Sequence, residues 1–351
     1  VQGDRGIMMD LDAIIKFLKE YNGRELKFME VCGTHTASIH KNGIPSMLSE
    51  RIKLISGPGC PVCVTVTEYI DRLSELAKMP ATTVLSFGDL LRVPGSRESL
   101  TAAKADVADF RMLYSALDVI YIAEKNPGQK YIFAAVGFET TAPVYALLIQ
   151  NAEKRNIKNL KLLTSLKTMP EVIRWVCSNT EGIDGFIAPG HVAVISGYSI
   201  YEKLAEENGI PFVVSGFEGE QLLAAIYALV KLSGQGKALN LYGSVVTEDG
   251  NKEAQDIVGR YFEPGTAAWR GMGCIDGSGM YIKKEYAVFD SGSHGLDRDD
   301  ENKGCHCAYI LTGAEKPDEC PLYGKICTPE HPVGACMVSM EGACFNNYEN
   351  R

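Results

Sequence analysis

The feature that most constrains this chain is a series of short, β-rich runs, most of which are followed by Gly. Helix-like stretches come after several of them, as in TEYIDRLSELAKM and GEQLLAAIYALVKL. Short buried strands that alternate with helices are typical of βαβ units, whose strands pair in parallel. The sequence therefore predicts an α/β fold with mainly parallel sheets. The predicted strands are KFMEVC, IKLISG, ATTVLSFG, KYIFAAVG, LKLLTS, GFIAPG and PFVVSG.

Two stretches of the chain resemble each other in this pattern. The run LISGPGC followed by TVLSFGDLL is similar to FIAPGHV followed by FVVSGFEGE. We therefore expect two related α/β domains, over residues 25–135 and 136–235, although any two βα units share Gly-rich turns. Residues 236–351 are rich in Gly, Asp and Ser and predict a third, loop-rich C-terminal domain. To this domain we assign residues 1–24, with a helix at 10–22.

Charge and cysteine content exclude several classes of function. The formal net charge is −9, and no Lys/Arg cluster forms the basic stripe that nucleic-acid binding needs, so nucleic acid is not expected as a partner. No run reaches the roughly 18 apolar residues of a membrane span, and the first residues lack the apolar region of a signal peptide. We expect a cytoplasmic protein, in which 11 cysteines indicate metal or redox chemistry rather than structural disulfides.

Residues that can carry chemistry follow directly after the predicted strands, in the motifs CGTH, GPGCPVC, GFETT and PGH. Ligands of open α/β sheets bind beyond the carboxyl ends of the strands, so we expect these turns to face one crevice. A thiol in the first turn of a helix has a lowered pKa and is therefore more reactive, which we expect of the C-x-x-C pair. The candidate site residues are Cys32, His35, Cys60, Cys63, Glu139 and His191.

Each candidate also has a purely structural explanation. Cys60 and Cys63 could be two small apolar residues packed in a turn, since free cysteine is often simply buried. The histidines could bond loop carbonyl groups, and Glu139 could be a carboxylate stabilised at the start of a helix. Elsewhere, Cys177 is expected to be buried, and Cys274 has no partner in the sequence.

The last segment holds six cysteines with the spacing C-x-C-x12-C-x6-C-x8-C-x7-C. Zinc sites normally use pairs of cysteines two to four residues apart, which the last four cysteines lack. An iron–sulfur cluster accepts wider spacings, because its thiolates need only converge on the cluster. The spacing therefore favours a cluster over zinc. It leaves Cys305 and Cys307 as further ligands or as a redox relay.

These motifs together resemble the HypD family of maturation factors for nickel–iron hydrogenases. The resemblance runs through MEVCGTHT, SGPGCPVCVT, SFGDLLRVPGS, VGFETTAP, APGHV and the tail CPLYGKICTPEHPVGACMVSMEGAC. It implies two similar α/β domains and a C-terminal iron–sulfur domain with a [4Fe-4S] cluster. It also implies a protein that is a monomer when alone. It further implies that such a protein assembles the Fe(CN)2CO unit of the hydrogenase together with a HypC-type chaperone and a HypE-type cyanide donor.

The resemblance further implies roles for individual residues. Cys32, Cys60 and Cys63 correspond to thiols that transiently bind iron carrying CN and CO and take part in redox chemistry. The residues implied to line the same crevice are His35, Glu139 and His191. Some members carry a further His where this chain has Ala37, to which we therefore assign no role. The implied cluster ligands are Cys320, Cys327, Cys336 and Cys344.

The chemistry of the residues agrees with this resemblance and with two other functions. Low-spin iron with CN and CO suits soft thiolate ligands, and a C-x-x-C pair can release it by changing between dithiol and disulfide. The chain could instead be a cluster-dependent protein-disulfide reductase of the ferredoxin–thioredoxin reductase type. It could also be a zinc-stapled α/β binding module in which Cys60 and Cys63 are structural.

Overall fold

The computed structural model describes residues 10–97, 99–103, 108–300 and 304–350. Within these ranges the strands form two sheets, here called sheet A and sheet B. Sheet A has the order β2-β1-β7-β8-β9, and all of its neighbouring strands are parallel. Its strands are β1 (Leu26–Glu30), β2 (Ile52–Ser56), β7 (Gly185–Pro189), β8 (Phe212–Ser215) and β9 (Ala238–Asn240).

Sheet B has the order β10-β11-β6-β5-β3-β4 and is parallel except for β10 and β11. Its strands are β3 (Thr82–Ser86), β4 (Phe110–Met112), β5 (Lys130–Gly137), β6 (Leu160–Lys167), β10 (Phe262–Trp269) and β11 (Gly273–Ile282). Central strands such as β3 and β7 are buried along their whole length. Strands of parallel sheets are covered on both faces, which explains their nearly continuous apolar sequences. The predicted α/β fold with mainly parallel sheets is confirmed.

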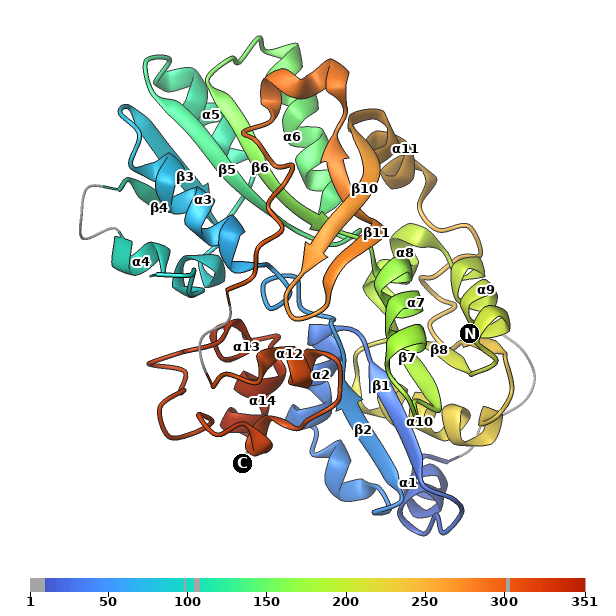
Figure 1. Cartoon of the computed structure of the whole chain (residues 1–351). Coiled ribbons are helices and arrows are strands. Elements are labelled where there is room, and N and C mark those ends of the chain that lie inside the picture. Colours follow the sequence, from blue (N-terminus) through green and yellow to red (C-terminus); the bar gives the residue numbers. More distant parts are fainter. Residues whose placement is uncertain (1–9, 98, 104–107, 301–303, 351) are drawn as a thin grey trace.

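Helices cover the sheets and connect their strands (Figure 1). α10 illustrates how the sequence forms them: Glu218 and Gln221 make a capping box at its start, and almost all of its residues from Leu222 to Leu229 are apolar and buried. The helices are α1 (Leu11–Lys19), α2 (Gly33–Lys41), α3 (Thr67–Ala77), α4 (Leu100–Ala103), α5 (Asp118–Lys125), α6 (Ala142–Lys154), α7 (Met169–Asn179), α8 (Gly190–Ser196), α9 (Ser199–Asn208), α10 (Gly219–Leu232), α11 (Lys252–Tyr261), α12 (Cys307–Leu311), α13 (Ala335–Val338) and α14 (Ala343–Glu349). The 3-10 helices are η1 (Ile44–Met47), η2 (Asp89–Arg92), η3 (Lys284–Phe289) and η4 (Pro317–Glu319).

Each sheet takes strands from distant parts of the chain. Sheet A combines β1 and β2 with β7, β8 and β9, whereas sheet B combines β3 to β6 with the β10–β11 hairpin. The predicted boundaries at 135/136 and 235/236 therefore do not coincide with the division between the sheets. Parallel strands need crossover connections, and here several of those connections pass from one sheet to the other and back.

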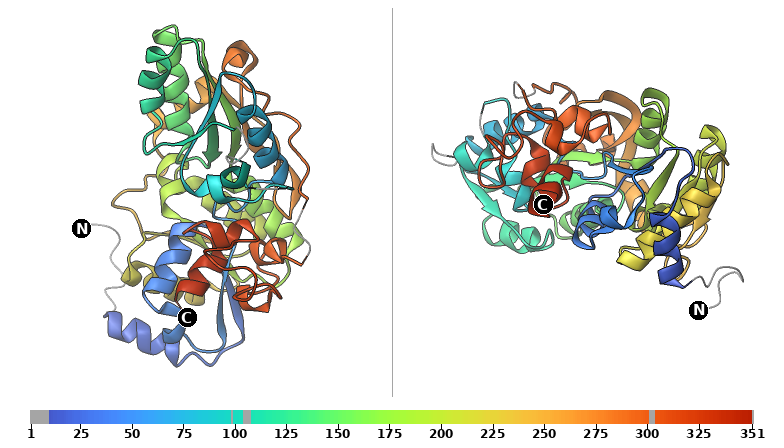
Figure 2. Two further views of the ribbon diagram at one scale, coloured as in Figure 1. Left: turned by 90° about the vertical axis from the view of Figure 1, so that its left-hand side faces the viewer. Right: turned by 90° about the horizontal axis from the view of Figure 1, so that it is seen from below.

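The N-terminal helix lies in a different part of the molecule from the one we expected. Ile14 and Leu18 of α1 belong to the same buried cluster as Leu222 and Leu229 of α10, on sheet A. Their apolar side chains are buried there, so α1 does not join the C-terminal segment. That segment, residues 304–350, forms a compact unit of short helices beside α2 (Figures 1 and 2). None of the helices in the described ranges combines the length and apolar character that a bilayer crossing requires.

Candidate functional site

The predicted motifs lie at the carboxyl ends of strands. Cys32 follows β1, the GPGCPVC segment follows β2, Glu139 follows β5 and His191 follows β7. Buried residues at these turns share one apolar cluster that spans both sheets, with Val31 and Cys60 on one side and Phe138 on the other. The junction of the two sheets is therefore where the candidate residues collect.

Cys32 is held in place by its backbone. It is the N-cap residue of α2, and its N–H donates to Glu30 Oε2 over 3.0 Å. The N–H of the next residue, Gly33, donates to the carbonyl oxygen of Gly59 over 3.0 Å, which fixes Cys32 beside the C-x-x-C loop. Burial raises the pKa of Cys32 to about 12, and nearby carboxylates add to this rise, while the N–H groups of His35 and Thr34 oppose it. The Cys32 side chain is therefore a protonated thiol at neutral pH.

Glu30 is a functional candidate that our sequence reasoning missed. Its side chain is 2% exposed, and it accepts hydrogen bonds from the Cys32 N–H and from the hydroxyl of Thr36. Burial raises the pKa of Glu30 to about 7. A signal was present in the sequence, because an acidic residue inside the apolar strand KFMEVC is unusual for a buried parallel strand.

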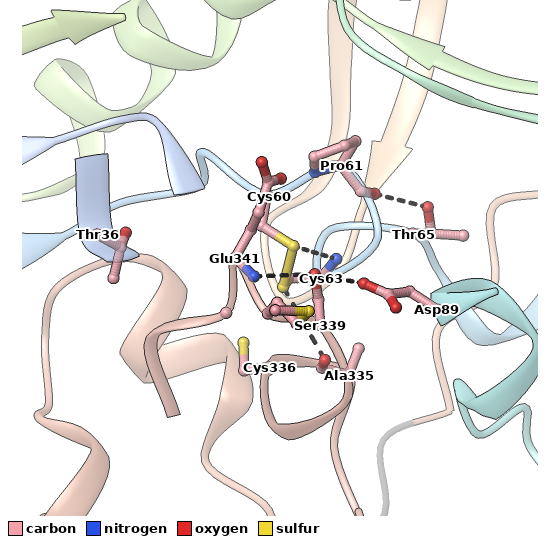
Figure 3. Close-up of a disulfide and its surroundings, with 12 residues drawn as sticks. Thr36, Cys60, Pro61, Cys63, Thr65, Asp89, Ala335, Cys336, Ser339 and Glu341 are labelled. Carbon is pink, nitrogen blue, oxygen red and sulfur yellow. Dashed lines mark hydrogen bonds between the residues drawn. A yellow bond between two sulfur atoms is a disulfide. The ribbon is translucent and has the colours of Figure 1, made fainter. Parts of the chain in front are cut away.

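Cys60 and Cys63 form a disulfide bond (Figure 3). The pair lies in a turn, which the Thr65 hydroxyl closes by donating to the Pro61 carbonyl over 2.9 Å, and α3 begins only at Thr67. The expected position in the first turn of a helix is therefore wrong, and the dipole of α3 does not act on these sulfurs at close range. The N–H of Cys63 instead donates to Cys60 Sγ over 3.1 Å.

His35 and His191 both pack against one aromatic ring, that of Phe217. The ring of Phe217 is 4.8 Å from that of His35 and 3.8 Å from that of His191, measured between centroids. His35 is fully buried, and burial lowers its pKa to about 4, so its imidazole is neutral at pH 7. Its Nε2 lies 3.1 Å from the Gly216 carbonyl and therefore carries the proton. Nδ1 is left as a buried acceptor with no partner among the described residues.

Glu139 faces a different part of the junction. Its Oε1 accepts the N–H of Met169 over 2.8 Å, and Oε2 has no hydrogen-bond partner in the described ranges. Burial raises the pKa of Glu139 to about 7. The hydroxyl of Tyr201 is likewise buried and unpartnered, and it interacts electrostatically with both Glu139 and Cys32. Tyr201 had no distinguishing signal in the sequence.

The six C-terminal cysteines converge on one small apolar pocket. The sulfur atoms of Cys307 and Cys336 are 2.9 Å apart, and Gly334 packs against Cys305, whose sulfur a Cβ at that glycine would approach to 2.7 Å. The remaining cysteines of the pocket are Cys320, Cys327 and Cys344. The other two cysteines lie elsewhere, Cys177 half-buried in α7 and Cys274 exposed in β11.

The donor set of this pocket fits a cluster better than a single ion. In the described part of the chain, no group of three or more His, Cys, Asp or Glu is placed to hold one metal ion. A mononuclear site needs its sulfurs within about 2.3 Å of a single point, whereas a cluster accepts thiolates distributed around a larger body. A buried, thiol-rich and apolar pocket has the soft donors that iron–sulfur chemistry uses.

The C-terminal segment contacts both the disulfide and the Cys32 turn. Cys63 Sγ lies 4.0 Å from the carbonyl oxygen of Ala335, the residue before Cys336 (Figure 3). Glu341 accepts the Thr34 hydroxyl over 3.1 Å, and a Cβ on Gly33 would lie 2.3 Å from the Cβ of Glu341. The structure thus brings Cys32, the disulfide and the cysteine pocket into one continuous region. The sequence alone did not predict that these three groups lie close together.

Comparison with known proteins identifies the chain. A sequence model described as "HypD: Hydrogenase formation hypA family" matches residues 9–351. Hydrogenase maturation factor HypD1 of Bradyrhizobium diazoefficiens is 41% identical over 355 residues, which cover 97% of this chain and 92% of the relative. Hydrogenase maturation factors HypD of Rhodobacter capsulatus and Escherichia coli (strain K12) are each 39% identical. Those matches cover 97% and 93% of this chain, and 93% and 90% of the relatives. The chain therefore belongs to the HypD family of hydrogenase maturation factors.

Proposed function

We propose that this maturation factor is the scaffold on which the Fe(CN)2CO unit of a nickel–iron hydrogenase is assembled. A HypC-type chaperone shares the iron and a HypE-type protein delivers cyanide. The observation that carries the proposal is that three sulfur sites lie next to one another. They are Cys32 beside the Gly59 loop, the Cys60–Cys63 disulfide, and the cysteine pocket next to Ala335.

Cys32 and Cys60 are the proposed iron ligands. Reduction of the disulfide takes two electrons and two protons and yields two thiols that can lose protons to a metal. The Cys63 N–H points at Cys60 Sγ, and a hydrogen bond of this kind stabilises a thiolate. Cys63 Sγ instead faces a carbonyl oxygen, which favours a protonated thiol. Cys63 is therefore assigned as the thiol that does not bind iron and that pairs with Cys60 in the oxidised protein.

The C-terminal pocket is the proposed site of a [4Fe-4S] cluster, with Cys320, Cys327, Cys336 and Cys344 as ligands. When bound, such a cluster supplies single electrons. The protein's own contribution is to bury the pocket and to set Ala335 against Cys63, so that the pocket cysteine Cys336 directly follows the residue that contacts the disulfide. His35 adds a neutral ring, and its Nδ1 has no partner among the described residues and is available to accept a hydrogen bond.

Infrared spectroscopy of anaerobically purified protein, co-expressed with its HypC-type chaperone, tests the proposal. Bound iron gives stretching bands of CN and CO. We expect Cys32→Ser and Cys60→Ser to abolish the bands, and Cys63→Ser to retain at least part of them. Complete absence of the bands in the wild-type complex would contradict the scaffold function, and equal loss in all three variants would contradict the assignment of Cys60.

A cluster-dependent disulfide reductase is the second candidate, favoured by the contact between the disulfide and the cysteine pocket. The burial of the disulfide argues against it. Cys60 is 3% exposed and Cys63 is fully buried, so a protein disulfide cannot reach either sulfur without an opening of the junction. Sustained reduction of a protein disulfide with an external electron donor, in protein without mononuclear iron, would support this alternative.

A further inference from the structure

Arg270 is a buried cation beside the C-x-x-C loop. It follows directly after β10, and its side chain is 5% exposed. Its backbone N–H donates to the Val64 carbonyl over 2.9 Å, and its Nε and Nη2 both donate to the Thr65 carbonyl, over 2.9 and 2.6 Å. Val64 and Thr65 follow Cys63 directly in the chain. The guanidinium group is therefore fixed next to the segment that carries the disulfide.

Arg270 also borders the cysteines. It lines a small cavity with Cys305, Cys307 and Gly334, and these three residues line the cysteine pocket as well. Cys307 in turn contacts the sulfur of Cys336 over 2.9 Å. Among the described residues that line either cavity, Arg270 is the one cation. A hydrogen bond with Cys307 and burial raise the pKa of the Cys305 thiol, and the charge of Arg270 opposes this rise. The cation thus acts on the edge of the cysteine pocket.

The positive charge of Arg270 is only partly neutralised. Asp299 Oδ1 lies 3.7 Å from Nη1, which is beyond hydrogen-bond distance, and both oxygens of Asp299 accept backbone N–H groups instead, each over 3.1 Å. Asp300 borders the same cavity, but it is exposed and pairs with Arg298 over 3.2 Å. A buried charge is costly without a close counter-charge. Negative charge in the cysteine pocket is therefore stabilised by Arg270.

We propose that Arg270 raises the reduction potential of an iron–sulfur cluster held in the cysteine pocket. This inference rests on the proposed function, in which the pocket holds such a cluster. Reduction transfers one electron from an external low-potential donor and exchanges no bond or proton, so the pocket gains one negative charge. The charge around a cluster is one of the factors that set its potential. Arg270 stabilises the reduced form more than the oxidised form, and Asp299 opposes this effect.

Potentiometric titration of the anaerobic protein with dithionite tests the proposal, with electron paramagnetic resonance as the readout. Arg270→Gln removes the charge and should make reduction about tenfold less favourable, a fall of about 59 mV for one electron. Asp299→Asn removes the counter-charge with little change of shape and should shift the potential upwards. Arg270→Lys keeps the charge but loses the paired bonds to the Thr65 carbonyl, and it should keep most of the wild-type potential.

A purely structural role for Arg270 predicts a different pattern. Loss of the bonds to Thr65 would then move Arg270→Lys as far as Arg270→Gln, and Asp299→Asn would not shift in the opposite direction. Either result would overturn the proposal, as would an unchanged potential in Arg270→Gln. If the glutamine variant does not retain a cluster, Asp299→Asn decides, because only the charge argument predicts an upward shift.

Iron and sulfide analysis of the wild type separates these outcomes from failure of the proposed function. Wild-type protein without a cluster would contradict the cluster and this inference together. A cluster whose potential does not depend on the charge at residue 270 would contradict this inference alone.

Discussion

Replacement of Gly59 by alanine tests whether the C-x-x-C loop and the Cys32 turn form one packed unit. A Cβ on Gly59 would lie 2.2 Å from the backbone nitrogen of Cys32 and 2.4 Å from the carbonyl carbon of Val31. Ordinary contacts begin at 3.4 Å, so the two segments must separate by about 1.2 Å, the difference between these distances. Neither neighbour is a flexible side-chain end that can move aside.

The expected destabilisation follows from two terms. Overpacking between two backbones costs about 3 kcal/mol, at the upper end of the usual range. A shift of this size also breaks the bond from the Gly33 N–H to the Gly59 carbonyl, which contributes about 1 kcal/mol. With about 2.1 cal/mol/K of unfolding entropy per residue, a chain of 351 residues shifts by about 1.4 °C per kcal/mol, so the thermal midpoint falls by about 5 °C.

Differential scanning fluorimetry measures this change, and Gly128→Ala is the matched control. A Cβ on Gly128 meets nothing within 4 Å, so we expect a change within about 0.5 kcal/mol. Alkylation of Cys32 should also become faster in Gly59→Ala, because the loop that covers it moves away. A midpoint as close to wild type as that of Gly128→Ala would refute the argument from backbone contact.

Three further predictions concern buried groups. Glu139→Gln should raise the thermal midpoint more at pH 8 than at pH 5. The pKa of Glu139 in the folded protein is about 7, so the free energy of unfolding of the wild type falls by up to about 3 kcal/mol as pH rises from 4.5 to 7, and the glutamine variant lacks this loss. The same difference in midpoint between variant and wild type at both pH values would contradict this argument. Cys336→Ala should remove the visible absorption, iron and sulfide of the anaerobic protein, whereas Cys274→Ala, outside the pocket, should keep them; colourless wild type containing zinc would refute the cluster. In oxidised, denatured protein, peptide mapping should find Cys60 joined to Cys63; alkylation of both thiols without prior reduction would exclude the disulfide.

Local patterns were sufficient for the strands and for the turns that follow them. The apolar run before each candidate residue is a strand in the structure, and Cys32, Glu139 and His191 lie directly beyond strand ends as expected. The hairpin β10–β11 was missed, because the glycines at 265, 273, 277 and 279 interrupt the alternation of residues and its register shifts between Gly265 and Ala267.

Contacts between residues far apart in the chain could not be predicted from local sequence patterns. Nothing in KFMEVC indicates that β1 pairs with β7, and nothing in GPGCPVC indicates that Cys63 lies against Ala335. The position of the C-x-x-C pair was missed for a similar reason. The Thr65 hydroxyl bonds the Pro61 carbonyl and delays the start of α3, a side-chain effect that apolar periodicity does not report.

The discontinuous sheets determine the order in which this protein can be made. β1 aligns Phe28 with Gly185 of β7, so the first strands leave the ribosome long before their neighbours in sheet A exist. Sheet B receives its β10–β11 hairpin only when Ile282 has been synthesised, and the six-cysteine pocket comes last. Contacts between such distant residues form slowly, and incomplete parallel sheets expose apolar edges. The Cys32 turn and Cys63 therefore gain their contacts with Glu341 and Ala335 only after those residues have been synthesised, and until then the early thiols are open to oxidation.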